Sequence, residues 1–395
     1  MTGIPLAETS GVPYPPPVRF PKSPGQPGDA GAARPSPGPE WPPATPPLRL
    51  KVFFWFILSA FSVFFAEVVS GSTRFPFFNP YKPWDFWGWL VEMPLYGLHI
   101  LVLAGFIFAR GKPRFESVFF AGVLFGLYEA YITKVLWAPS WGPPVWTAGG
   151  IAIVELVVIS LWWHPFMSFA IPLAAAETVL TSSREVLGGL PARAKSLLAR
   201  RGRLLFILFS AWAGAMHGGD DPFSALLSSL ISAIVILGLV HLWKRRTAGA
   251  TYTLRQLLPD GMQTARLFAT LLFLYIILGG LLMRERIPGL AAQAPVWAMY
   301  AIFLGLLFVS LERGRRLPDA GPPARLGAPG RAPLWFFLIF TAMSVLLNRF
   351  SMIVLAGSWF LGIAAGVGAL AWSVRETLAR PGNVPDAPPR GQRQS

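Results

Sequence analysis

The sequence predicts an all-α protein: a polytopic transmembrane helix bundle with about ten spans (8–10) and both termini in the cytoplasm. Three observations lead to this fold class. Hydrophobic residues make up 53% of the chain and charged residues only 13%, about half the usual charged share. The apolar residues gather in ten long stretches, and basic residues gather in alternate connections between them. A soluble fold could not cover so much apolar surface, so lipid is the expected solvent.

A helix needs roughly 20 mostly apolar residues to cross the hydrocarbon layer, and ten stretches reach or approach this length. The stretches begin near Val52, Phe86, Ser117, Ala148, Leu204, Phe223, Arg266, Val296, Leu334 and Ser351. The fourth extends to about Leu180 and contains Pro165 and Pro172, which predict a kink or a break. The fifth and ninth are near the lower limit of length, which is why the expected count runs from eight to ten.

The positive charges indicate which side each connection faces. With both termini in the cytoplasm, 28 of the 34 Lys and Arg residues fall on the cytoplasmic side. The other six are Arg74, Lys82, Lys134, Arg284, Arg286 and Arg349. This asymmetry follows the positive-inside rule, and it accounts for the net charge of +15 without nucleic acid. We therefore expect a multi-pass protein of the cytoplasmic (cell) membrane whose partner is the lipid bilayer and not nucleic acid.

Composition also divides the chain into four parts. Residues 1–49 form a proline-rich arm, expected to be disordered, cytoplasmic and able to dock a cytosolic partner, because proline removes backbone donors and favours extended conformations. Residues 50–244 form the half of the bundle that carries the intramembrane polar residues, with a charged helix near 183–202 expected on the membrane surface. Residues 245–374 are expected to be apolar scaffold helices, and residues 375–395 a disordered tail.

Ionisable side chains inside spans are costly, about 2.5 to 3.5 kcal/mol each at the membrane centre, so they usually face a cavity or one another. Four glutamates from four different spans fall at a similar depth in the outer half: Glu67, Glu92, Glu129 and Glu155. Four acids at one depth would be hard to tolerate against lipid. The sequence therefore predicts a polar cavity that opens outward.

Other polar residues extend this candidate site. Lys134 follows Glu129 late in the third span, His164 lies near the membrane centre, and Ser168 is one helical turn below it. Glu177 is close to the inner surface. Glu129 and His164 are the deepest and hardest to solvate, which makes them the strongest functional candidates.

Each candidate also has a structural interpretation. Glu92 and Glu155 could simply reach the lipid headgroups, and Glu67 could cap a helix or pair with Lys134. No catalytic residue, metal ligand or cofactor is assigned from the sequence. The chain has no cysteine, which excludes disulfides and thiolate chemistry, and it lacks the His-Glu-x-x-His motif of zinc hydrolases.

Short blocks around these polar positions resemble a family of uncharacterised polytopic membrane proteins of bacteria and archaea. The blocks are Ala66 to Ser72, Phe77 to Pro80, Leu95 to Gly97, Gly126 to Ala130 with Lys134, and His164 with Ser168 to Pro172 and Glu177. The resemblance implies a common site at Glu67, Glu129, Lys134, His164 and Glu177, with Glu92, Glu155 and Ser168 as secondary candidates. Tyr128 stands where the family more often has a second glutamate. The resemblance implies no particular activity.

A weaker likeness is to the prenyl-protein-type intramembrane endopeptidases. Their pattern is a glutamate pair with an arginine four residues on, followed by histidines on later helices. The nearest match here is Tyr128-Glu129 with Lys134, then His164 and His217. Both the pair and its spacing differ from that pattern.

Three functions remain open at this point. The leading hypothesis is a proton- or cation-coupled carrier in which Glu129 and Glu67 bind the coupling ion, Lys134 sets their charge state and His164 acts as a deeper relay. The competing hypothesis is an intramembrane hydrolase or transferase for a membrane-embedded or lipid-linked substrate, with Glu129 as general base near His164. The third is a non-catalytic membrane scaffold whose proline-rich arm recruits a cytosolic partner.

Overall fold

The computed structural model describes residues 45–219, 221–248, 250–316 and 331–379. Almost all of its regular structure is helical, which confirms the all-α fold class, and its strands form one two-residue hairpin. The hairpin pairs Thr147 with Ala152 and Ala148 with Ile151. Gly149 and Gly150 form its turn with φ angles of 58° and 80°, a left-handed conformation that glycine adopts without steric cost.

The described part of the first half of the chain contains twelve elements. They are α1 (Leu48–Val63), η1 (Phe64–Val68), η2 (Gly88–Glu92), α2 (Met93–Arg110), α3 (Phe115–Gly126), η3 (Leu127–Ala130), β1 (Thr147–Ala148), β2 (Ile151–Ala152), α4 (Ile153–Glu155), η4 (Leu156–Ala170), α5 (Ile171–Leu180) and α6 (Glu185–Gly188). Elements η1, η2 and η4 are π-helical, and η3 is a 3₁₀ helix.

The second half is built from longer helices. They are α7 (Ala192–His217), α8 (Pro222–Thr247), α9 (Leu254–Leu257), α10 (Gly261–Leu274), η5 (Tyr275–Leu281), η6 (Arg284–Arg286), α11 (Leu290–Arg316), α12 (Ala332–Leu346), η7 (Asn348–Phe350) and α13 (Ser351–Leu378). Element η5 is π-helical and continues α10, whereas η6 and η7 are 3₁₀ turns.

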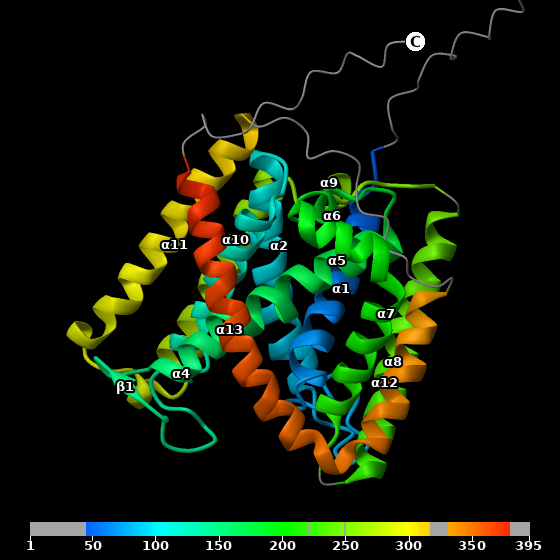
Figure 1. Cartoon of the computed structure of the whole chain (residues 1–395), viewed down its shortest axis with the longest axis horizontal. Coiled ribbons are helices and arrows are strands. Elements are labelled where there is room, and N and C mark those ends of the chain that lie inside the picture. Colours follow the sequence, from blue (N-terminus) through cyan, green and yellow to red (C-terminus); the bar gives the residue numbers. More distant parts are fainter. Residues whose placement is uncertain (1–44, 220, 249, 317–330, 380–395) are drawn as a thin grey trace, which may run out of the picture. The chain divides into compact units, whose positions relative to one another are not determined.

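The long helices alternate in direction, so the bundle has two distinct ends (Figure 1). At the end where α1 begins, which we call the basic end, Trp243 of α8 donates to the carbonyl of Leu180 at the end of α5, at 2.8 Å. At the other end, which we call the acidic end, Nδ1 of His217 lies 2.5 Å from the carbonyl oxygen of Val68. These contacts join helix ends that are far apart in the sequence.

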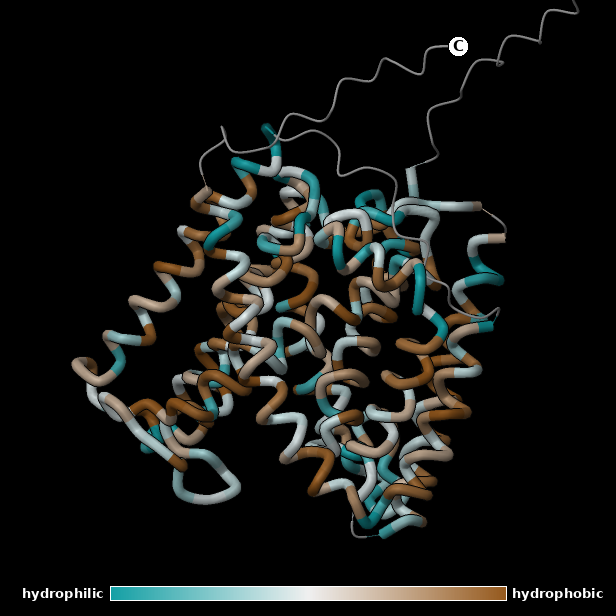
Figure 2. The backbone as a smooth tube through the Cα atoms, in the orientation of Figure 1, coloured by the Kyte–Doolittle hydropathy of each residue, from teal (hydrophilic) through white to brown (hydrophobic). Residues whose placement is uncertain are grey.

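All ten predicted stretches are helical. Among the described residues, seven helices are long and apolar enough to cross a membrane: Leu48–Val68, Gly88–Arg110, Ile153–Leu180, Pro222–Thr247, Gly261–Leu281, Leu290–Arg316 and Asn348–Leu378. Figure 2 shows hydrophobic residues along much of these helices. Helix α12 is apolar but shorter, and α3 with η3 reaches only from Phe115 to Ala130. The number of spans and the side on which the termini lie stay predictions.

The fourth stretch, for which a kink or a break was predicted, has no break. It runs as one helix from Ile153 to Leu180, with Pro165 inside the π-helical part and Pro172 in the first turn of α5. A π-helix bonds each N–H to a carbonyl five residues back. Proline has no N–H to donate to such a bond. The irregular hydrogen bonding therefore occurs at the prolines, and the helix continues through them.

Several predicted boundaries shift in the structure. Helix α1 already begins at Leu48, inside the predicted arm, and α13 continues to Leu378, inside the predicted tail. The rest of the arm, residues 1–44, and of the tail, residues 380–395, lies outside the described residues. The charged stretch 183–202 is not one separate helix: it contains α6 and the start of α7, which continues to His217 across a non-helical residue at Arg201.

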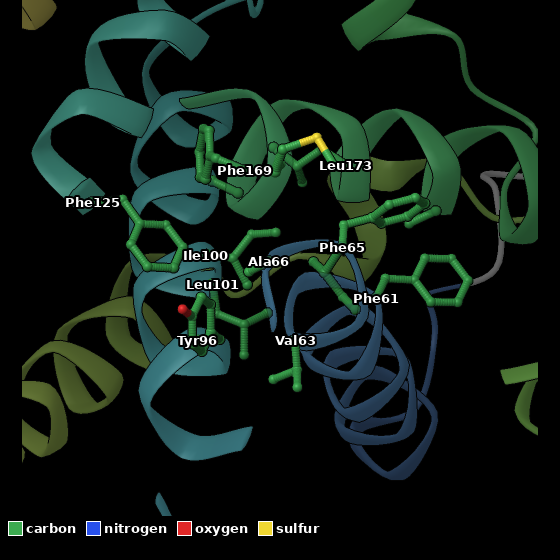
Figure 3. Close-up of a cluster of buried hydrophobic side chains, with 14 of the residues drawn as sticks. Phe61, Val63, Phe65, Ala66, Tyr96, Ile100, Leu101, Phe125, Phe169 and Leu173 are labelled. Carbon is green, nitrogen blue, oxygen red and sulfur yellow. The ribbon is translucent and has the colours of Figure 1, made fainter. Parts of the chain in front are cut away.

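The core forms where α1 and η1 pack between α2 and the η4–α5 helix. Figure 3 shows side chains from all three meeting in one cluster, among them Ala66, Ile100 and Phe169. A Cβ on Gly97 would lie 2.2 Å from Oγ of Ser59, so only glycine lets α2 approach α1 this closely. Close packing through small residues is the usual means of helix association in lipid.

Candidate functional site

Two glycines of α3 determine how closely it packs against η4. A Cβ on Gly122 would lie 2.4 Å from Cα of Pro165, and a Cβ on Gly126 would lie 2.7 Å from Cα of Ser160. Because the two glycines are four residues apart, they share one face of the helix. This contact brings η3, which follows α3, against the helix that carries His164.

The close approach pairs Glu129 with His164. Oε1 of Glu129 lies 2.9 Å from Nε2 of His164, and the hydroxyl of Thr133 donates to Oε2. Nδ1 of His164 lies 2.7 Å from Oγ of Ser168 one turn further along the helix. The side chains of Glu129 and His164 are only 9% and 2% exposed. Both ring nitrogens therefore have a defined partner, which fixes the orientation of the imidazole.

A second carboxylate lies on the same side of the bundle. The hydroxyl of Tyr96 donates to Oε1 of Glu67, and the hydroxyl of Tyr128 donates to Tyr96 at 3.1 Å. The ring of Tyr128 also contacts the imidazole of His164 edge-on, at 5.1 Å between centroids. The two tyrosines therefore connect the Glu67 carboxylate to the surroundings of the Glu129–His164 pair.

Thr73 links Glu67 to a third carboxylate. Its hydroxyl oxygen lies 3.1 Å from Oε2 of Glu67 and 2.7 Å from Oε1 of Glu92. A hydroxyl has one proton to donate, so both contacts are hydrogen bonds only if one of the two glutamates is protonated and donates to Thr73. Glu67, Thr73 and Glu92 thus form one group in which the Thr73 hydroxyl lies between two carboxylates.

Most of these groups line one cavity of about 660 Å³ at the acidic end, although Thr73 and Ser168 do not. Its polar side chains are those of Glu67, Ser70, Ser72, Glu92, Tyr96, Tyr128, Glu129, Thr133, Lys134, Ser140, His164 and Arg286. The remaining wall is largely apolar and includes side chains of η5 and α13 such as Leu278 and Leu355. Trp141 and Trp359 meet at 6.4 Å between ring centroids, and Trp141 is exposed. The tryptophan pair therefore lies where the cavity reaches the surface.

Lys134 borders this cavity but does not pair with its carboxylates. Its ammonium group donates to the carbonyls of Leu278, at 2.9 Å, and Leu282, and to Ile132 at 3.4 Å. In the described part of the chain, no ion pair joins it to Glu67 or Glu129. Its backbone is left-handed, with φ of 62°, which turns the residue toward the end of η5. Lys134 therefore caps the end of a neighbouring helix.

Two predicted site residues lie away from the cavity. The carboxylate of Glu177 accepts hydrogen bonds from the backbone N–H groups of Val186 and Leu187, each at 3.1 Å. It is at the basic end and joins α5 to α6. Glu155 is buried at the acidic end, and its Oε2 has no hydrogen-bond partner among the described residues, but it does not line the cavity. The structure thus brings together Glu67, Glu92, Glu129 and His164.

Sequence reasoning missed several residues of the cavity. Thr133 follows η3 and Arg286 is in η6, and both line the cavity; Thr73 does not line it but contacts Glu67 and Glu92 from a connection. Leu278 and Leu355 also line the cavity and come from helices predicted to be apolar scaffold. Tyr96 could have been predicted from the sequence, because it lies in one of the blocks that carry the family resemblance.

No metal centre is evident in the described ranges: they contain no group of three or more His, Asp or Glu side chains placed to hold a metal ion. Glu129 and His164 form a pair, and Glu67 is connected to their surroundings through tyrosine hydroxyls. The arrangement therefore has the composition of a proton-transfer site, with carboxylates, an imidazole and phenols.

Comparison with known proteins identifies the family. Residues 56–380 match a family described as an uncharacterized membrane protein family. The chain belongs to this family. A protein of Archaeoglobus fulgidus, described as an uncharacterized protein, is 33% identical to the chain over 258 residues, which cover 65% of this chain and 78% of that protein. No solved structure matches the chain.

Membership confirms the resemblance that the sequence blocks predicted, and it makes this a membrane protein. All residues that line the cavity, from Ala66 to Trp359, lie inside the range matched by the family. The proline-rich arm lies outside it. The cavity therefore belongs to the part of the chain that defines the family.

Proposed function

We propose that this protein is a membrane-embedded hydrolase in which Glu129, paired with His164, activates water against a carbonyl carbon. The observation that carries the proposal is the 2.9 Å contact between Oε1 of Glu129 and Nε2 of His164 on the wall of a cavity. A carboxylate and an imidazole in contact can pass a proton between them, which is what general acid–base catalysis requires.

The chemistry balances with these two groups alone. Glu129 takes a proton from water while the water oxygen forms a bond to the carbonyl carbon of an ester or amide. The tetrahedral intermediate then breaks its bond to the leaving oxygen or nitrogen. That atom takes the proton, passed from Glu129 or through His164, and the products are an acid and an alcohol or amine. Ser168 is 0% exposed and does not line the cavity, so it orients His164 and is not the nucleophile.

The cavity favours an organic substrate over a bare ion. Its volume of about 660 Å³ falls in the range of about 300 to 1,000 Å³ that is usual for small-molecule sites. Most of its wall is apolar, and its polar groups include Glu129 and His164. This distribution suits a substrate with an apolar body and one carbonyl group, delivered from the lipid.

The carrier remains the second candidate because of the group formed by Glu67, Thr73 and Glu92. A proton shared between two carboxylates is a store of the kind that a coupled carrier uses. Transport also needs a route to the opposite face, and here the polar connection is short. From His164 it passes to Ser168, whose carbonyl accepts from Ser62 at 2.6 Å. In the described residues no further side-chain hydrogen bond continues from Ser62 toward the basic end, which favours the hydrolase.

The experiment that tests the hydrolase uses the purified full-length chain in detergent micelles. Two probes cover the two leaving groups: p-nitrophenyl laurate as the ester, and a quenched fluorescent peptide with an apolar segment as the amide. Glu129→Gln keeps the shape of the side chain but removes the base, so we expect cleavage to fall by about 10²- to 10⁴-fold.

The matched control is Glu116→Gln, because Glu116 is a buried glutamate at the other end of the same helix, paired with Arg114 at 3.6 Å. It should cleave the probe at the wild-type rate. Unchanged cleavage by Glu129→Gln would contradict the proposal. A wild-type protein that cleaves neither probe, but carries protons into liposomes in a way that Glu67→Gln abolishes, would establish the carrier instead.

A further inference from the structure

A second cavity, of about 370 Å³, lies in the half of the bundle toward the basic end. It is enclosed by α1 with η1, α5, α7, α8 and α12, and its lining includes Phe64, Ala174, Leu205, Ile236, Ala332 and Phe336. Thr178 is the polar side chain in the lining, and its hydroxyl is already used, donating to the carbonyl of Ala174 at 2.7 Å. The lining side chains therefore offer a ligand an apolar surface and no free hydrogen-bonding group.

Two arginines flank this cavity. Arg331 immediately precedes Ala332, which lines it at the start of α12. Arg201 lies in α7 between the lining residues Leu198 and Leu205 and directly before Gly202, which also lines the cavity. Both arginines are exposed. Neither guanidinium has a hydrogen-bond or ion-pair partner among residues 45–219, 221–248, 250–316 and 331–379.

The helix that carries Arg201 is irregular at this point. Arg201 has φ of −126° and ψ of 18°, outside the helical region, so α7 bends at the level of the cavity. Gly202, the next residue, lines the cavity and is buried. The bend therefore places an unpartnered positive charge directly beside an apolar space.

We infer that this cavity binds one acyl chain of an anionic glycerophospholipid whose phosphate is held by Arg201 and Arg331. An acyl chain matches a wall without free polar groups, and a phosphate matches planar guanidinium groups that have no protein partner. Charge decides against a zwitterionic lipid: the basic residues of the chain concentrate at this end, and such clusters attract anionic lipids. The site is separate from the acidic cavity and does not depend on the function proposed for it.

The test measures lipid retention by the purified full-length chain with native mass spectrometry. The delipidated protein is titrated with phosphatidylglycerol or phosphatidylcholine of the same acyl composition. We expect one phosphatidylglycerol to bind at least tenfold more tightly than phosphatidylcholine. Arg201→Gln combined with Arg331→Gln should remove that preference, whereas Arg349→Gln, which changes an exposed arginine at the acidic end, should keep it.

The acyl-chain part is tested twice, because a variant that fills the cavity could fold poorly. Ala174→Phe places a ring in the cavity and should abolish phosphatidylglycerol binding while Glu129→Gln leaves it intact. On the wild-type protein, palmitoyl lysophosphatidylglycerol should bind about as tightly as the two-chain lipid, and dihexanoyl phosphatidylglycerol at least tenfold more weakly. Equal binding of both headgroups would overturn the role of the arginines. Equal binding of short and long chains would overturn the role of the cavity.

Discussion

The single helix from Ile153 to Leu180 carries buried His164 near its middle and buried Glu177 near its C-terminal end, and the two differ in their partners. Glu177 accepts hydrogen bonds from backbone N–H groups of α6 and, at 3.5 Å, from the hydroxyl of Ser183, none of which is an acid or base near neutral pH. His164 contacts Glu129 and Ser168, whose side chains can exchange protons, and it borders a cavity. Burial of a charge therefore does not by itself mark a functional site; titratable partners beside open space do.

This difference predicts what each residue contributes. A buried carboxylate bonded to fixed backbone donors contributes to the stability of the fold, because its loss leaves those donors unsatisfied. A carboxylate bonded to an imidazole beside a cavity contributes to chemistry, because its proton can move. The following predictions test the comparison, from the largest expected effect to the smallest.

The first prediction concerns Glu177. Glu177→Ala should lower the free energy of unfolding by about 3 kcal/mol, because two buried backbone N–H groups at the start of α6 lose a charged acceptor. The measurement is unfolding in detergent followed by tryptophan fluorescence. Glu177→Gln retains one acceptor oxygen and should lose about half as much. If Glu177→Ala is as stable as the wild type, or if it loses cleavage without losing stability, Glu177 does not have the purely structural role assigned to it.

The second prediction concerns Lys134, which borders the cavity but bonds to backbone carbonyls. By the same logic, Lys134→Met should cost stability, about 2 kcal/mol, because the carbonyls at the end of η5 lose a charged donor. Cleavage of the ester probe by the remaining folded protein should change little.

Lys134→Gly separates the backbone from the side chain, because glycine adopts the φ of 62° without strain. We expect it to be more stable than Lys134→Met and less stable than the wild type. A Lys134→Gly protein as stable as the wild type would assign the residue a purely backbone role. A cleavage defect in folded Lys134→Met that is as large as that of Glu129→Gln would place the lysine among the reacting groups.

The third and smallest effect is expected at Ser168. Ser168→Ala removes one hydrogen bond to the imidazole, and about 1 kcal/mol of lost orientation corresponds to roughly a fivefold slower cleavage. Ser160→Ala is the matched control: Ser160 is one turn to the other side of His164, equally buried, and its hydroxyl has no partner among the described residues. Equal effects of the two substitutions would show that packing, and not orientation of the ring, is what matters.

The helical architecture was accessible from the sequence because it depends on local properties. Runs of apolar residues predicted all ten helical stretches, and depth along those runs predicted that Glu67, Glu92 and Glu129 lie at one level. Depth also placed Glu177 correctly near the basic end; the resemblance alone put it in the site. His164 and Glu177 are 13 residues apart, which is about 20 Å along a helix, so one cavity could hardly include both.

The hydrogen-bond partners of these polar residues could not be predicted from the sequence, because they depend on backbone angles and on contacts between distant parts of the chain. Nothing in the residues around Lys134 indicates a left-handed conformation, and without it the lysine would be expected beside Glu129. The close contact at Gly122 and Gly126 depends on a helix more than 30 residues later in the chain. Thr73 joins Glu67 to Glu92 from a connection that hydropathy does not resolve.

In the π-helical stretch from Leu156 to Ala170, the number of residues before His164 matters as much for its contact with Glu129 as the residue types do. Adding or removing one residue before His164 would turn the imidazole around the helix axis, away from Glu129, by a little less than the roughly 100° per residue of an α-helix, while the hydropathy of the segment stayed the same. Substitutions that keep the register can be absorbed there, but a change of length by a single residue would leave an intact membrane helix without the contact between His164 and Glu129.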